Sequence, residues 1–183
     1  MVLVETVGVG QSEVTVRSMV DFFLLVLAPG AGDELQGIKK GVVELADAVL
    51  INKADGASRN LALMSRADYE RALHYIQPST EGWTTPALAA SSTTGEGLPE
   101  LWAMVQRFLE HARGRGLFEQ RRREQERAWM RAMVEEQLRE RFFNHPSVLT
   151  LLPEMEQAVA EGRLPAASAA ARLLKAFDGD SPA

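Results

Sequence analysis

The chain has 183 residues, of which 46% are hydrophobic and 25% charged, and it contains no cysteine. This composition is typical of a globular protein and excludes disulfide bonds and thiolate metal sites. The formal net charge of −5 argues against nucleic acid as a main partner, because binding phosphates requires a basic face. The longest apolar run, residues 22–29, is too short for a membrane span of about 20 residues. We therefore expect a cytoplasmic protein without a membrane partner.

The first 116 residues alternate short apolar runs with helical patterns. Strands are predicted at residues 2–4, 22–27, 48–51 and 87–90. Helices are predicted at residues 35–45, 65–76 and 98–112, each from apolar residues at helical spacing. The strands are apolar throughout, as parallel strands buried on both faces are. The order of elements predicts an α/β domain with a parallel sheet.

The pattern changes after Gly116. Residues 117–143 carry no strand signal and predict one long helix, which Asn144-His145-Pro146 ends. Two shorter helices are predicted at about 148–160 and 165–177. We therefore place a domain at residues 1–116 and a helical appendage at 117–183. One face of the long helix is apolar, and it consists of Met130, Met133, Val134, Leu138 and Phe142.

The most specific motif, Asn52-Lys53-Ala54-Asp55, directly follows a predicted buried strand. Ligands of open α/β sheets bind beyond the carboxyl ends of the strands. An N-K-x-D tetrapeptide there is typical of guanine recognition, since one carboxylate can accept both N1–H and the exocyclic amine of guanine. Asn52 would hold the loop, and the stem of Lys53 would cover the ring. The alternative is that Asp55 only caps a helix.

A second polar loop, Ser91-Ser92-Thr93, follows the next predicted strand. In GTPases an S-A-x motif at this place offers backbone N–H groups to the guanine carbonyl oxygen. Ser92 replaces the usual Ala, which a backbone donor tolerates. An ordinary loop rich in Ser, Thr and Gly is the alternative. The order of the two motifs, one strand apart, favours a guanine site.

An acidic residue and a glycine follow the first predicted strand, in Glu5-Thr6-Val7-Gly8. This layout is typical of a switch that senses Mg²⁺ and the γ-phosphate. Glu5 would meet the metal, directly or through water, and the Gly8 N–H could approach the phosphate. A tight turn capped by Ser12 is the alternative.

Three segments together resemble the MeaB/ArgK family of P-loop GTPases. They are Val4 to Glu13, Pro29 to Gly41 and Asn52 to Gly56, and the resemblance covers residues 2–112 strongly. It implies a Mg²⁺-dependent GTPase that binds GTP and GDP, forms a homodimer and is a chaperone of adenosylcobalamin-dependent methylmalonyl-CoA mutase, gating cofactor loading and protecting the mutase. It also implies that the apolar face of the long helix is the dimer interface. Residues implied in the switches and in partner contact are Gln11, Asp33, Glu34, Gln36, Lys39 and Lys40.

The sequence departs from that family in one respect. It contains no G-x-x-x-x-G-K-[ST], the loop that cradles the nucleotide phosphates. We therefore expect a partial P-loop GTPase domain without its P-loop strand, and a chain that is inactive by itself. The alternative functions are a non-catalytic module for dimerisation and partner binding, and an ArgK-type kinase or ATPase linked to basic-amino-acid transport.

Two further groups of residues predict no site. His74, His111 and His145 lack the spacing of metal ligands. The run Arg121-Arg122-Arg123 lies in a helix of mixed charge, where a solvated face is expected rather than contact with an acidic partner.

Overall fold

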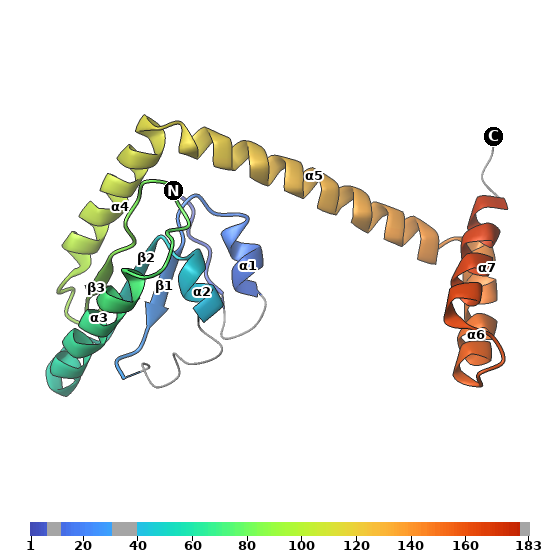
Figure 1. Cartoon of the computed structure of the whole chain (residues 1–183), viewed down its shortest axis with the longest axis horizontal. Coiled ribbons are helices and arrows are strands. Elements are labelled where there is room, and N and C mark those ends of the chain that lie inside the picture. Colours follow the sequence, from blue (N-terminus) through green and yellow to red (C-terminus); the bar gives the residue numbers. More distant parts are fainter. Residues whose placement is uncertain (7–11, 31–39, 180–183) are drawn as a thin grey trace. The chain divides into compact units, whose positions relative to one another are not determined.

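The structure is a computed structural model that describes residues 1–6, 12–30 and 40–179 (Figure 1). The chain divides into two compact units, Met1–Gln125 and Glu126–Ala183. The division falls inside one helix, α5 (Leu117–Phe143), which begins in the first unit and ends in the second. In the described residues, no helix combines the length and the apolar character needed to cross a membrane.

The first unit is built on a parallel sheet of three strands. They are β1 (Leu24–Leu27), β2 (Ala48–Ile51) and β3 (Ala87–Ala89), in the order β1-β2-β3. The register pairs Leu25 with Val49 and Ile51 with Ala89. All four residues of the central strand β2 are buried. The predicted α/β class with a parallel sheet is confirmed.

Helices cover this sheet. They are α1 (Ser12–Arg17), α2 (Lys40–Leu45), α3 (Arg59–Leu73) and α4 (Leu98–Gly114), and a 3-10 turn, η2 (Gly56–Ser58), leads into α3. The helix α3 packs against β2 and β3. Its side chains Tyr69 and Leu73 belong to the core, as their spacing predicts. α3 begins six residues before the predicted start at Ser65. The apolar residues in its first turns, Leu61 to Met64, follow one another without helical spacing, and of these four only Ala62 is buried.

The predicted strand at residues 2–4 is wrong. Val2 and Leu3 are 85% and 84% exposed and belong to no strand. A strand requires a neighbour for its backbone hydrogen bonds, and none of the three strands pairs with this segment.

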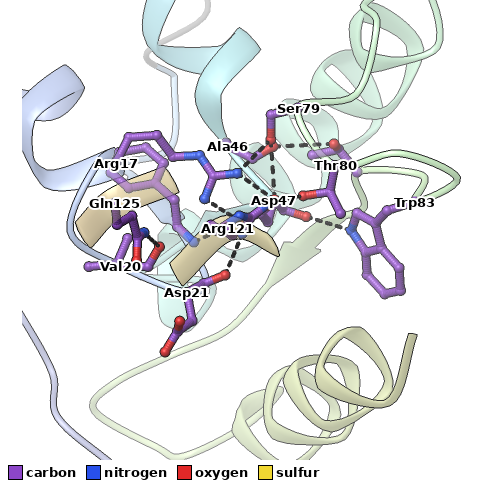
Figure 2. Close-up of polar contacts among 12 residues, drawn as sticks. Arg17, Val20, Asp21, Ala46, Asp47, Ser79, Thr80, Trp83, Arg121 and Gln125 are labelled. Atoms are coloured by element: carbon purple, nitrogen blue, oxygen red, sulfur yellow. Dashed lines mark hydrogen bonds and ion pairs between the residues drawn. The ribbon is translucent and has the colours of Figure 1, made fainter. Parts of the chain in front are cut away.

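A buried carboxylate lies immediately before β2 (Figure 2). Asp47 is completely buried, and its Oδ2 accepts hydrogen bonds from the Phe23 N–H at 2.9 Å and from Arg17 at 3.0 Å. Its Oδ1 accepts hydrogen bonds from the hydroxyls of Ser79, at 3.2 Å, and Thr80, at 2.5 Å. Every lone pair that burial removes from water thus has a partner, as a buried charge requires.

The first turns of α5 reach the same carboxylate. Arg121 lies 3.6 Å from Asp47 Oδ2 and donates a hydrogen bond to Thr80 at 2.6 Å. Arg122 forms a bidentate pair with Asp21, at 3.0 and 2.8 Å. The expected solvated face is therefore wrong for Arg121, whose side chain is only 18% exposed. A buried acid 74 residues earlier in the sequence leaves no local pattern from which this contact could be predicted.

The second unit contains the end of α5 and the helices α6 (Pro146–Ala160) and α7 (Ala166–Gly179), which pack against each other. Its core residues are Val148, Met155, Ala158 and Ala169. The bounds of α5 are the predicted ones. Four of the five predicted interface residues are exposed, Met130 by 58% and Leu138 by 56% among them. The fifth, Phe142, is half-buried and its ring contacts Phe177.

Candidate functional site

The N-K-A-D turn follows β2 without a gap. The Asn52 N–H continues the sheet by donating to the Leu27 carbonyl at 2.9 Å, and the Ala54 N–H donates to the Ala90 carbonyl at 3.1 Å. Between them, Lys53 has a φ of +60°. A residue other than glycine rarely adopts this left-handed conformation, and where one does the surrounding structure must hold it there. Lys53 is exposed, so its side chain is available to a ligand.

The side chain of Asn52 joins the two predicted motifs. Its Oδ1 accepts the Lys53 N–H at 2.8 Å and the Ser92 N–H at 3.1 Å. Its Nδ2 donates to the Ser92 hydroxyl at 3.3 Å. A single amide thus bonds to its own turn and to a loop 40 residues later, which is the loop-holding contact expected of it. The two loops meet because the strands before them are parallel neighbours.

The second loop, residues 91–96, is closed on itself. The buried Ser91 donates its N–H to the Glu96 carbonyl at 2.9 Å and accepts the Gly95 N–H on its own carbonyl at 2.9 Å. Its hydroxyl accepts the N–H groups of Thr93 and Thr94 at 3.2 and 3.1 Å. The N–H groups that the sequence assigns to guanine therefore bond within the site. Those of Ser92 and Thr93, at 3.1 and 3.2 Å, lie at the long end of the hydrogen-bond range.

Asp55 is the last residue of the N-K-A-D turn and directly precedes η2, which leads into α3. Asp55 is half-buried and precedes η2 in an extended conformation, with φ −133° and ψ 168°. It occupies the N-cap position, but its side chain makes no capping hydrogen bond. In this structure the carboxylate therefore does not act as the cap that the alternative assigns to it.

An ion pair that the sequence analysis missed joins the start of α3 to the loop 91–96. Arg59, the first residue of α3, contacts both carboxylate oxygens of Glu96 at 3.2 and 2.6 Å. Both partners of the ion pair line a small cavity, together with Ala54, Leu63, Ala89 and Ala90. The two partners are 37 residues apart, so no local spacing could have indicated the pair.

The loop 91–96 ends at a glycine that the fold requires. Gly97 has a φ of +81°, and a Cβ at this position would lie 2.4 Å from the Ala89 carbonyl oxygen. No side chain can approach backbone that closely, so only glycine fits between the end of β3 and the start of α4.

For the remaining predicted site residues the structure gives no contact that supports a role in the site. Glu5 is exposed and lies in no helix or strand. Six of the predicted site residues lie outside the described part of the chain: Gly8, Gln11, Asp33, Glu34, Gln36 and Lys39. The side chain of Lys40, at the start of α2, is not described either. The described residues contain no group of three or more His, Cys, Asp or Glu side chains that could hold a metal ion.

Comparisons with known proteins match nearly the whole chain. The model of a family described as methylmalonyl Co-A mutase-associated GTPase MeaB matches residues 1–147. A Caulobacter vibrioides protein named as a GTPase is 51% identical over 97% of this chain and 54% of its own length. The mouse protein named methylmalonic aciduria type A homolog, mitochondrial, is 41% identical over 97% of this chain and 43% of its own length.

A solved structure described as LAO/AO transport system kinase has the same fold, with a TM-score of 0.70 and 31% identity over 93% of this chain and 54% of that one. The chain thus spans about half the length of the relatives it matches. Three observations agree on the family of this chain. They are the parallel sheet, the paired loops at its carboxyl end and the family match over most of the sequence. This chain belongs to the MeaB family of methylmalonyl-CoA mutase-associated P-loop GTPases.

Proposed function

We propose that the chain supplies the guanine-recognition part of a GTPase. The observation that carries this proposal is the Asn52 side chain, which bridges the N-K-A-D turn and the Ser92 loop at the carboxyl ends of adjacent strands. Guanine has a donor edge and a carbonyl oxygen, and a site for it must offer an acceptor and donors at once. Asp55 and the Ser92 loop offer these two kinds of group.

Each residue has a distinct role in this proposal. The Asp55 carboxylate accepts N1–H and the exocyclic amine, and the stem of the exposed Lys53 covers the ring. The carbonyl oxygen of guanine takes over one of the long bonds that Ser92 and Thr93 now donate, at 3.1 and 3.2 Å. Adenine has no donor at N1 and no carbonyl oxygen, so it would leave both the carboxylate and the N–H groups without partners.

We propose GTP hydrolysis as the activity of a whole protein of this family, of which this chain spans about half the length. GTP hydrolysis requires phosphate and Mg²⁺ contacts, and we assign Glu5 and Gly8 to them on the family resemblance alone. On the same basis we propose that the protein is a chaperone of a cobalamin-dependent methylmalonyl-CoA mutase, with the residues named in the switches in contact with that partner. The name of the matching family supports this proposal.

The substitution Asp55→Asn tests base recognition. An amide in place of the carboxylate keeps one acceptor and turns the other into a donor, which suits the N1–H and C2 carbonyl of xanthine better than the two donors of guanine. In titration calorimetry we expect selectivity to move from guanine toward xanthine nucleotides. Unchanged selectivity would show that Asp55 does not contact the base.

We also propose that residues 117–183 dimerise the protein. The exposed apolar face of α5 supports this, because a soluble helix rarely leaves four such residues in water. Val134→Glu together with Leu138→Glu should give a monomer in sedimentation, with Arg139→Glu as a control on the same helix. A double variant that stays dimeric would refute the interface. Phe142 is less suitable for this test, because its contact with Phe177 is internal.

A further inference from the structure

The ion pair of Arg59 and Glu96 has the geometry of a specific link. Arg59 Nη1 donates to Glu96 Oε2 at 3.2 Å and Nη2 donates to Oε1 at 2.6 Å, in the fork arrangement that fixes orientation as well as distance. The side chains are 55% and 53% exposed. Exposed pairs contribute little to folding stability. We therefore expect this pair to affect the position of the two loops more than the free energy of unfolding.

Glu96 is the last residue of the loop 91–96, and its backbone closes that loop. Its carbonyl accepts the Ser91 N–H, and its own N–H donates to the Thr94 hydroxyl at 3.3 Å. Both ends of the segment that contains Ser92 are thus tied to Glu96. When the Glu96 side chain is held by Arg59, the whole loop is held against the N-terminus of α3.

Arg59 fixes the other side of the site. Only η2 separates it from Asp55, and the Ser58 N–H donates to the Asp55 carbonyl at 3.1 Å. The distance between the Asp55 carboxylate and the Ser92 loop therefore depends on three links. These are Asn52 to Ser92, Ala54 to Ala90, and Arg59 to Glu96. The third is the one link between charged side chains among them.

We propose that Arg59 and Glu96 are positioning residues that set the separation of the two guanine-reading loops and thereby the discrimination of guanine from other bases. This inference rests on the proposed guanine site. Reading the carbonyl edge and the amine edge together requires both loops at a fixed spacing. If the pair is broken, a base that lacks the amine should lose less affinity than guanine does.

The test compares GMP with IMP, which differs from it only by the exocyclic amine. Chemical-shift titrations of the 183-residue chain give both dissociation constants, and amide hydrogen exchange of Thr93 and Thr94 reports on the loop. In Arg59→Gln we expect the preference for GMP over IMP to fall about fivefold, the equivalent of one hydrogen bond, and the exchange to quicken. The swapped pair, Arg59→Glu with Glu96→Arg, should restore both.

The control is Arg71→Gln, which breaks an exposed ion pair with Asp68 away from the loops and should change neither readout. Retained discrimination and unchanged exchange in Arg59→Gln would overturn the positioning role while leaving the guanine site intact. A wild-type chain that binds GMP and IMP equally would instead overturn the proposed function. Exchange that quickens equally in the control would assign the effect to general loosening and also overturn the inference.

Discussion

The two ends of the four-residue strand β2 are flanked by carboxylates that differ in burial and in hydrogen bonding. Asp47, before the strand, is completely buried, and its carboxylate accepts hydrogen bonds from four other residues. Asp55, after the strand, is half-buried and makes no capping bond. The protein itself satisfies the first carboxylate, whereas the second does not cap the turn η2 that follows it. The two carboxylates therefore differ in how far the described part of the protein uses their capacity to accept hydrogen bonds.

The largest effect should come from Asp47→Ala. The substitution leaves Arg17 and Arg121 in a mostly buried place without their carboxylate, and we expect a loss of about 3–5 kcal/mol in the free energy of unfolding. Urea titration measures this loss. The matched control is Asp68→Ala, whose exposed pair with Arg71 should contribute less than about 1 kcal/mol. Similar losses in both variants would contradict the view that Asp47 stabilises the fold because it and its guanidinium partners are buried.

An intermediate effect is expected from Gly97→Ala, between the loop that follows β3 and the start of α4. The new Cβ would meet the Ala89 carbonyl oxygen at 2.4 Å, so the backbone must move, at a cost of about 1–3 kcal/mol. Gly95→Ala is the control, since Gly95 has the same left-handed conformation, with φ +80°, but no atom within 4 Å of the added Cβ. The difference in thermal midpoint between the two variants isolates the clash. Equal midpoints would show that the loop moves without cost.

The smallest effect on stability should come from Asn52→Ala. Its hydrogen bonds lie at an exposed loop, and we expect a loss of only about 1 kcal/mol in the free energy of unfolding. Affinity for guanine nucleotides should nonetheless fall strongly, because the two loops lose their direct link. Parallel measurement of unfolding and of nucleotide binding separates the two effects. A loss as large as that of Asp47→Ala would place Asn52 among the folding residues.

The sequence predicted the elements better than the contacts between them. The bounds of β2 and α5 were predicted because each is a local pattern, an apolar run in one case and an uninterrupted helix in the other. The N-K-A-D turn and the Ser92 loop could be placed together because parallel strands end at one edge of a sheet.

The missed contacts are all remote in sequence. Asp47 lies between two alanines, and its guanidinium partners are 30 and 74 residues away, so nothing near it distinguishes it from a surface acid. The pair of Arg59 and Glu96 is hidden in the same way. The strand expected at residues 2–4 failed for a related reason, since an apolar run becomes a strand only beside a partner.

The left-handed backbone of Lys53 has a consequence for protein engineering. A screen that selects only for heat resistance would favour glycine there, because glycine adopts a φ of +60° without steric strain. The same replacement would remove the side chain assigned to cover the base. Heat resistance and nucleotide affinity should therefore trade against each other at this one position, and libraries designed for stability are best built with Lys53 held constant.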